Sequence, residues 1–327
     1  MLERDEFVRL AVGPFQRELL TYCYRMLGSV QDAEDTVQDT FLRAWRAFDQ
    51  FDPQRASLRT WLYRVATNVC LTALEHRRRR LLPSAMVHVY EDPDAGPLDP
   101  KPEIPWLQPI PDLLLGSDSP DPATIVSSRT SVRLAFVAAL QLLPPRQRAA
   151  LILRDVLAWR SHEVADFLDT STAAVNSALQ RARAQMTEQM PVEEDIVEPE
   201  QSDQRAVLDS YVAAFEASDM SALTRLLHRD AVLEMPPFLS WFAGRDAVRR
   251  FFAVIWARRK SGAWRMLPSG ANRQPAAVAY VRGEDGQLRA HSVQVFTIGP
   301  HGIERIVAFI EPALFDRFGM PAVWTPG

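Results

Sequence analysis

Five side chains between positions 172 and 183 have the types and spacing to contact DNA. Asn and Gln pair with adenine edges, and Arg pairs with guanine edges or with phosphates. A helix through this segment would also present free N–H groups and the positive end of its dipole to a phosphate. DNA reading is the sharper interpretation, and a solvated polar face on an ordinary three-helix bundle is the alternative. The five candidates are Thr172, Asn176, Gln180, Arg181 and Arg183.

A helix-turn-helix is the element that would position these residues. A short amphipathic run from Ser161 is followed by the turn residues 169–171 and then by a longer amphipathic run to Met186. Short helix, three-residue turn and longer helix are typical of this motif, whose second helix enters the major groove. The side chains expected inside are Val164, Ala165, Leu168, Val175, Leu179 and Ala182.

A second candidate DNA face lies near the end of the first helical segment. Asn68 and Thr72 fall opposite the apolar stripe of the helix that begins near Ser57, and Arg64 precedes them. Their side chains are candidates for contacting single-stranded bases. The run Arg77, Arg78, Arg79 and Arg80 closes the helix, and its expected use is neutralisation of phosphates, which makes binding depend on salt. A solvated helix end is the plainer alternative, because cations complement the dipole there.

Composition sets limits on the class of protein. The chain has 327 residues, 47% hydrophobic and 24% charged, with a net charge of −4. It has no apolar run of eighteen residues, so no membrane span and no membrane partner are expected, and the acidic N-terminus predicts no signal peptide. Cys23 and Cys70 stand apart, and no Cys/His cluster or Gly-rich loop occurs, so neither a metal nor a cofactor is expected. A cytoplasmic location is the simplest interpretation.

The C-terminal part follows a different pattern. Amphipathic helices after position 203 are followed by strand-like runs with Gly-containing turns, which indicates an α+β domain. His291 lies in one such run, and simple alternation places it with Val293 and Val295, so it is a weak candidate for a general base. No acid–base partner occurs at a diagnostic spacing. A structural histidine is the alternative, and we do not expect an enzyme.

Three sequence blocks resemble a known family. "DAEDTVQDTFLRAWRAF", "FDPQRASLRTWLYRVATN" and "LPPRQRAALILRDVLAWRSHEVADFLDTSTAAVNSALQRARAQM" resemble sigma-70 family factors of the extracytoplasmic-function (ECF) type. The part after 203, with "FGMP" near its end, is similar to a SnoaL-like domain of the NTF2-like fold. The expected fold is two all-α sigma domains, the second with a helix-turn-helix, followed by an α+β cone. The expected boundaries are 1–80 for region 2, 81–128 for an acidic proline-rich linker, 129–190 for region 4, 191–202 for a second acidic linker and 203–327 for the SnoaL-like domain.

The resemblance implies roles for these parts. Core RNA polymerase would be the partner, through the clamp helices of its beta-prime subunit and through its beta subunit, together with promoter DNA. Residues 57–80 would melt and read the −10 element, and residues 172–186 would read the −35 element as duplex. An anti-sigma factor and a small ligand in the C-terminal pocket stay open as further partners. The residues assigned to polymerase docking are Asp32, Asp35, Gln38, Asp39, Phe41 and Trp45.

The stretch "PEIPWLQPIPDLLLG", residues 102–116, raises a separate expectation. Its prolines keep it extended and remove ladder donors. Trp106, Leu107 and Leu114 are nevertheless costly to leave in water. We therefore expect these three residues to dock, most simply against the C-terminal domain.

The preferred interpretation is a promoter-recognition factor whose own C-terminal domain adjusts its activity. One alternative is a SnoaL-like enzyme tethered to DNA-binding helices. Another is a helix-turn-helix repressor with a ligand-sensing domain. A helix that docks on polymerase separates the first interpretation from the last, because a repressor does not need that contact.

Overall fold

The computed structural model describes residues 11–75, 78–115, 130–189, 201–259 and 262–325. The chain divides into two compact units. The first, here called the helical unit, contains residues 1–80 and 114–191. The second, the sheet unit, contains residues 81–113 and 192–327. The chain therefore leaves the helical unit after Arg80 and returns to it at Leu114.

The first part of the helical unit is three helices that pack on one another. Gly28 ends the first of them in a left-handed conformation with φ 68°, and its N–H bonds to the Tyr24 carbonyl at 2.8 Å. Ser29 begins the next helix, because its hydroxyl accepts the Asp32 N–H at 3.2 Å. Gly at the end and Ser at the start are the residues that these positions favour. The helices are α2 (Gly13–Leu27), α3 (Val30–Arg46) and α4 (Leu58–Glu75).

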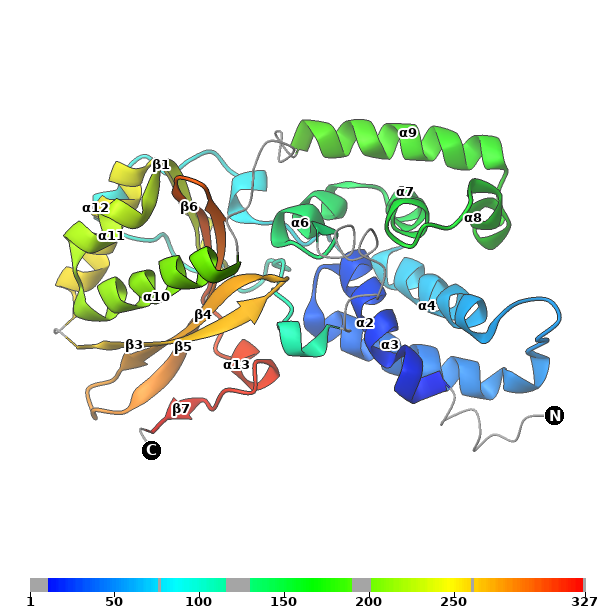
Figure 1. Cartoon of the computed structure of the whole chain (residues 1–327), viewed down its shortest axis with the longest axis horizontal. Coiled ribbons are helices and arrows are strands. Elements are labelled where there is room, and N and C mark those ends of the chain that lie inside the picture. The colour runs from blue at the N-terminus through cyan, green and yellow to red at the C-terminus, as the bar shows by residue number, and fades with distance from the viewer. Residues whose placement is uncertain (1–10, 76–77, 116–129, 190–200, 260–261, 326–327) are drawn as a thin grey trace. The chain divides into compact units, whose positions relative to one another are not determined.

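The second part contains the expected helix-turn-helix. The Ser171 hydroxyl caps the longer helix by accepting the Ala174 N–H at 3.1 Å, and Asp169 makes the turn with φ 49°. All six side chains expected inside are buried. Figure 1 shows these helices in green above the blue N-terminal helices. The elements are α6 (Leu134–Leu142), α7 (Pro145–Leu151), the π turn η6 (Ile152–Val156), α8 (Ser161–Phe167) and α9 (Thr172–Gln189).

The sheet unit is built on one mixed, curved sheet. The order of its strands is β2-β1-β6-β5-β4-β3, and β7 pairs with β5. Strands β1 and β6 are parallel, and the other pairs are antiparallel. Asn272 and Arg273, both with φ 57°, make the tight turn between β3 and β4. The strands are β1 (Leu227–Glu234), β2 (Trp241–Ala243), β3 (Trp264–Ala271), β4 (Gln274–Arg282), β5 (Leu288–Gly299), β6 (Gly302–Phe309) and β7 (Val323–Trp324).

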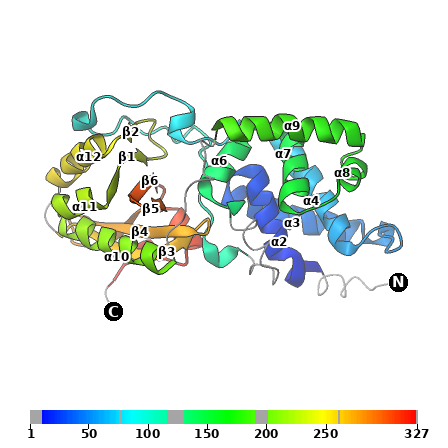
Figure 2. The same ribbon diagram turned by 45° about the horizontal axis from the view of Figure 1, so that its top comes forward.

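Helices cover one face of this sheet and enclose an aromatic core, as Figures 1 and 2 show. Phe215 stands at its centre and meets the rings of Phe252, Trp256 and Trp264 edge to face, with centroids 5.4–5.6 Å apart. Such contacts contribute beyond the buried area alone. The α+β architecture expected from the sequence is therefore confirmed. These helices are α10 (Gln201–Ala217), α11 (Met220–Leu226) and α12 (Arg245–Ala257). The short helix α13 (Leu314–Arg317) lies outside this core, and its Phe315 meets Tyr280 of β4 edge to face at 5.1 Å.

Residues 81–113, expected as linker, instead fold along the sheet unit as what we call the strap. Its backbone bonds to the unit at several points, for example Tyr90 N–H to the Trp241 carbonyl at 2.9 Å and Lys101 N–H to the Pro237 carbonyl at 2.8 Å. Figures 1 and 2 show it in cyan beside α12 and the first strands. Its short 3₁₀ turns are η3 (Pro83–Ala85), η4 (Pro93–Ala95) and η5 (Asp112–Leu114), the last of which ends in the helical unit.

No helix in the described parts of the chain is long and apolar enough to cross a membrane.

Candidate nucleic-acid interface and docking face

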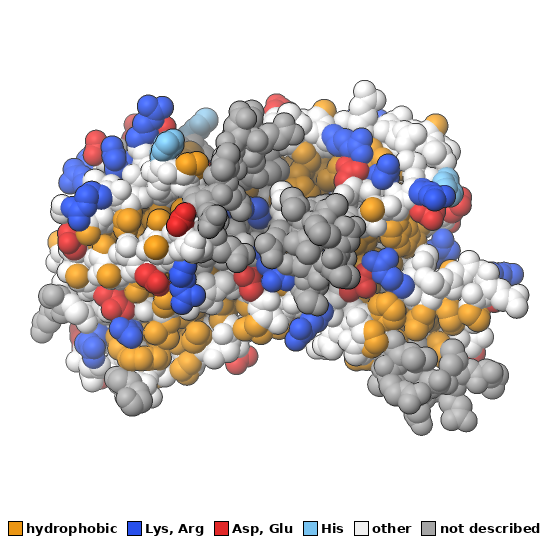
Figure 3. All heavy atoms as spheres, viewed as in Figure 1, with side chains coloured by type: hydrophobic (Ala, Val, Ile, Leu, Met, Phe, Trp, Pro, Cys, Tyr) orange, Lys and Arg blue, Asp and Glu red, His pale blue; other side chains and the backbone are white. Residues whose placement is uncertain are grey.

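The outward side of α9 carries the first set of candidates. Thr172, Asn176, Gln180, Arg181 and Arg183 are all exposed, whereas the apolar side of the helix is buried. This separation follows the helical period, which returns to the same face every three to four residues. The face shown in Figure 3 mixes basic and acidic side chains over both units.

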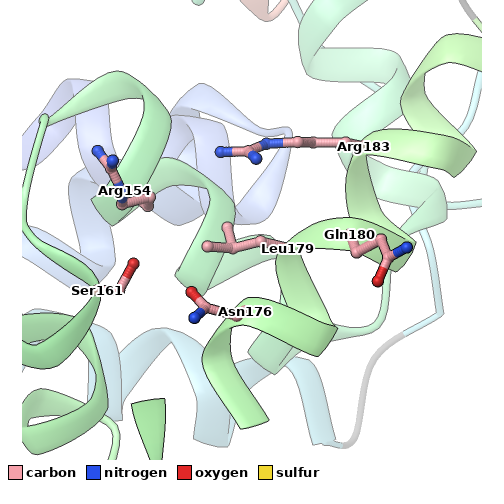
Figure 4. A pocket seen from close by; sticks show the side chains of 6 residues that line it. All are labelled: Arg154, Ser161, Asn176, Leu179, Gln180 and Arg183. Atoms are coloured by element: carbon pink, nitrogen blue, oxygen red, sulfur yellow. The ribbon is translucent and has the colours of Figure 1, made fainter. Parts of the chain in front are cut away.

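A polar hollow of about 380 Å³ opens beside this helix, and Figure 4 shows its lining. Arg183 extends from α9 toward Arg154 of η6, and Ser161 at the start of α8 faces Asn176 across it. Arg183 is held by the carboxylate of Asp155 in a two-pronged pair, at 2.9 Å through Nε and 2.6 Å through Nη2. That hydrogen-bonded carboxylate raises the pKa of Arg183. Sequence reasoning missed Arg154 and Asp155, because only the fold brings η6 to α9.

The second set of candidates lies on α4. Arg64, Asn68 and Thr72 are exposed and four residues apart, so they form one row along the helix. The Arg64 guanidinium donates to the Asp166 carbonyl of α8 at 3.2 Å and lies 5.5 Å from the centre of the Phe167 ring. Within the helical unit, the first residue of the row is therefore engaged by the helix-turn-helix.

The basic end of α4 differs from the expectation. Arg77 lies outside the described residues, and Arg78 and Arg79 are exposed. Arg80 instead pairs with Asp32, at 3.1 Å through Nε and 2.7 Å through Nη2, with side chains only 19% and 11% exposed. The sequence assigned these two residues to phosphate binding and to polymerase docking. In the structure the two residues form an ion pair with each other, because the segment after α4 lies next to the start of α3.

The outward face of α3 forms an apolar groove of about 460 Å³. Gln38, Phe41 and Trp45, all expected to dock, line it, and Asp35 and Asp39 lie on the same helix outside its lining. Leu42 also lines it with its side chain 48% exposed, and this residue was missed. Its position four residues after Gln38 and three before Trp45 was the available signal. An exposed Leu and an exposed Trp side by side are typical of a protein-binding surface.

Two buried arginines join the two halves of the helical unit. Arg25 of α2 donates to the Ser131 carbonyl at 3.1 Å and to its hydroxyl at 2.8 Å. Arg148 of α7 donates to the Met26 carbonyl, to both oxygens of Gln141 and to the Leu143 carbonyl. Burial lowers the pKa of Arg25 to about 10 and that of Arg148 to about 9. The acceptors are carbonyl oxygens and a hydroxyl. The two guanidinium groups are therefore held by hydrogen bonds to neutral groups and not by ion pairs.

His291 of β5 sits at an irregularity of the sheet. Ser292 pairs with Ala279 and Ala290 pairs with Tyr280, which leaves His291 as the extra residue of a bulge. The bulge interrupts the simple alternation that placed His291 with Val293 and Val295. Its ring instead meets Trp264 edge to face at 5.0 Å, and its Nδ1 is buried with no hydrogen-bond partner among the described residues. Burial, assisted by the positive charge of Arg259, lowers the pKa of His291 to about 4.

Three further polar or aromatic side chains of the sheet unit, Tyr211, Trp241 and Glu311, have partners other than His291. The Tyr211 hydroxyl donates to Gln294 at 2.9 Å inside the core. The Trp241 indole N–H donates to the Val87 carbonyl at 2.9 Å, and Glu311 accepts from Gln108 at 3.0 Å. Two of these groups therefore bind the strap. The described residues contain no group of three or more His, Cys, Asp or Glu side chains that could hold a metal.

The three strap residues expected to dock belong to two different units. Trp106 is 7% exposed and Leu107 is fully buried, and both belong to the sheet unit. The Trp106 indole N–H donates to the Lys101 carbonyl at 2.8 Å. Leu114 belongs to the helical unit, where it lines the apolar groove of α3. The expectation that Leu114 docks on the C-terminal domain is therefore wrong.

Comparisons with known proteins agree with this architecture. Residues 11–80 match the Sigma-70 region 2 model, residues 133–186 match Sigma-70 region 4, and residues 208–316 match the SnoaL-like domain. The ECF RNA polymerase sigma factor SigG of Mycobacterium tuberculosis is 48% identical over 94% of this chain and 82% of its own length. SigJ of the same organism is 30% identical over 88% and 81%. The crystal structure of SigJ superposes with a TM-score of 0.64 at 26% identity, covering 98% of this chain and all of that one.

Proposed function

The chain belongs to the ECF family of RNA polymerase sigma factors, and from that premise we propose which of its surfaces performs each part of promoter recognition. Core RNA polymerase and promoter DNA are the partners of such a factor. The groove of α3 would meet the clamp helices of the polymerase beta-prime subunit. The row on α4 would read single-stranded bases of the −10 element, and α9 would read the −35 element in the major groove. The chain would act in the cytoplasm.

One observation carries this assignment. A single helical unit presents an exposed apolar groove on α3 and a solvent-facing polar row on α9. The first surface suits a protein partner, because desolvation of Leu42 and Trp45 would favour association. The second suits base edges and phosphates. A repressor would need only the second surface, so the pair of surfaces supports an initiation factor.

In the helical unit the two parts that would read the −10 and −35 elements lie in contact, which we call the closed form, and they would have to separate to reach both elements. The −10 and −35 elements lie about two duplex turns apart, roughly 70 Å at 34–36 Å per turn. Here α4 touches α8 through Arg64 and Asp166, and α2 touches α7 through Met26 and Arg148. We propose that this closed form is a resting state and that polymerase binding separates the two halves.

For the C-terminal domain we propose regulation and no reaction. His291 has a cation, Arg259, as its electrostatic neighbour, and Trp241 and Glu311 are used to hold the strap. A general base needs a proton-accepting side chain within reach of a substrate. The extensive binding of the strap supports a role in controlling the chain segment that joins the two sigma regions.

Run-off transcription tests this function. Core polymerase supplemented with the purified chain is expected to make promoter-specific transcripts from a library of genomic fragments, and core polymerase alone is not. The matched variant is Leu42→Ser with Trp45→Ser, which removes the apolar groove and leaves α9 intact. It is expected to lose transcripts while keeping duplex binding. Absence of any promoter-specific transcript with the wild-type chain would contradict the proposal.

A further inference from the structure

A small hollow within the helical unit is not explained by any surface assigned so far. It measures about 130 Å³, room for about four water molecules at ~30 Å³ each. Arginine side chains from two parts of the unit line it. Arg78, Arg79 and Arg80 come from the end of the α4 segment, and Arg148 comes from α7.

The charges around this hollow do not balance. Asp32 is the one carboxylate in its lining, and Asp32 is bonded to Arg80. Arg78 and Arg79 have no carboxylate partner among the described residues. Arg79 is close enough to Arg148 for its positive charge to lower the pKa of Arg148 further. Like charges gathered around one hollow repel each other unless an anion joins them.

Arg148 supplies a second, independent sign of a ligand. Its side chain is 2% exposed, and its two terminal nitrogens are satisfied by carbonyl and amide oxygens. Its Nε–H has no acceptor among the described residues. A buried donor without an acceptor costs free energy that a bound oxygen would recover.

We propose that this hollow is a binding site for a phosphate-type oxyanion. Arginine guanidinium groups match the geometry of phosphate oxygens, and the hollow has the size of one phosphoryl group and not of a whole nucleotide. A larger phosphorylated molecule would insert only its terminal group. The oxyanion has two sources with the same chemistry, the backbone of promoter DNA or a small phosphorylated metabolite.

The site has a consequence for the helical unit. Gln141, Leu143 and Pro145, from the second part of the helical unit, also line it. A bound oxyanion therefore contacts both halves of the closed form and stabilises that form by mass action. Stabilisation of the closed form would oppose initiation, and this consequence rests on the proposed function. Binding of the oxyanion itself does not depend on the proposed function.

Titration calorimetry of the full chain with inorganic phosphate tests the site, in chloride buffer at constant ionic strength. Wild type is expected to bind one phosphate saturably. Arg79→Gln is expected to bind about tenfold more weakly, because it loses a charge-assisted hydrogen bond. Arg148→Lys is a second variant, which keeps the positive charge and loses the planar set of guanidinium donors, and it is also expected to bind phosphate more weakly. Arg55→Gln is the matched control, because its side chain is 87% exposed and lies outside the hollow.

The outcomes separate cleanly. No saturable phosphate binding, or equal weakening in Arg79→Gln and Arg55→Gln, overturns the site. If a single-stranded oligonucleotide competes with phosphate in wild type and not in Arg79→Gln, the site is supported and DNA is its source. If a nucleoside diphosphate competes and the oligonucleotide does not, the site is supported with a soluble ligand as its source. Since none of these measurements uses polymerase, they stand whether or not promoter-specific transcription is found.

Discussion

The carboxylate of Asp112 accepts the backbone N–H of Arg273 at 2.7 Å, so the end of the strap grips the tight turn between β3 and β4. Ile110 completes the grip, because its N–H donates to the Asn272 side chain at 3.1 Å and its carbonyl accepts the Asn272 N–H at 2.9 Å. Gly270 leaves room for the carboxylate, since a Cβ there would lie 2.6 Å from Asp112 Oδ2. These three bonds hold the C-terminal end of the strap on that turn.

Asp112→Ala is therefore expected to loosen the strap at its C-terminal end. The loss is about 1.5–3 kcal/mol of docking free energy, typical for a hydrogen bond between a charged group and a backbone N–H. Limited proteolysis should show faster cleavage between residues 105 and 115. Gly270→Ala, which displaces the same carboxylate by contact, should give the same cleavage pattern. Unchanged cleavage in both variants would mean that the turn does not hold the strap.

Trp106→Ala is expected to have a larger effect, at about 3 kcal/mol, because it empties a buried aromatic site. Hydrogen exchange should rise in the strap from Leu81 onward, since Leu81 and Trp106 form a bridge. Leu113→Ala is the matched control, because its side chain is 56% exposed. Equal hydrogen exchange in the two variants would show that Trp106 does not hold the strap on the sheet unit and that the strap acts as a passive spacer.

Leu114→Ser is expected to raise affinity for core polymerase about three- to tenfold. Leu114 lines the α3 groove beside Phe41, Leu42 and Trp45. If polymerase has to displace this partly buried leucine when it binds the groove, the displacement costs about 1 kcal/mol that the serine variant would not lose. Binding of labelled chain to core enzyme measures this directly, with Leu113→Ser as the neighbouring control. Weaker binding by Leu114→Ser would show instead that Leu114 is part of the docking surface.

On α9, two substitutions should separate base reading from phosphate binding. Asn176→Ala is expected to relax sequence preference within the −35 element and to cost about 1–3 kcal/mol for the preferred site. Arg181→Ala is expected to weaken all sequences alike and to reduce the salt slope by about one. Binding to a randomised duplex library at two salt concentrations measures both. Identical changes in the two variants would argue against direct readout by Asn176.

His291 makes the stability of the sheet unit depend on pH. Its folded pKa of about 4 lies below the ordinary value of 6.5, so the unfolded chain takes up the proton first as pH falls. The stabilisation is complete above pH 6.5 and decreases between 6.5 and 4. It amounts to about 3 kcal/mol in total, of which about 2 kcal/mol is lost between pH 7 and pH 5. Urea unfolding at pH 7 and pH 5 should show this loss in wild type and not in His291→Leu. His162→Gln, an exposed histidine of α8, is the control.

The sequence predicted the helices well because their signals are local. Ser29 and Ser171 cap helices within three residues of the groups they bond, and the apolar period places Val175 and Leu179 inside. The pairing of Asp32 with Arg80 spans 48 residues and needs the fold, so neither partner could be recognised as engaged.

The apolar groove of α3 and the strap were predicted only in part. Phe41 and Trp45 were found because they follow the helical period. Leu42 lies three residues before Trp45 and therefore on the same side of the helix, but it was not assigned to the groove that it lines. The cost of hydrating Trp106 predicted its burial, but hydrophobicity does not name a partner, so Leu114 was placed on the wrong unit. The bulge at His291 shifts a register by one residue, which alternation alone cannot anticipate.

The bridge between Leu81 and Trp106 closes most of the strap into a loop, and this changes how far the two sigma regions can be drawn apart. With the loop closed and Ile110 and Asp112 bound to the β3–β4 turn, the usable tether begins near Leu113, about 17 residues before Thr130. Fully extended, that length reaches roughly 60 Å, less than the ~70 Å between the two promoter elements. A docked strap thus leaves the connection without slack, and any event that frees it returns the reach of about 32 residues, from Leu81 to Asp112.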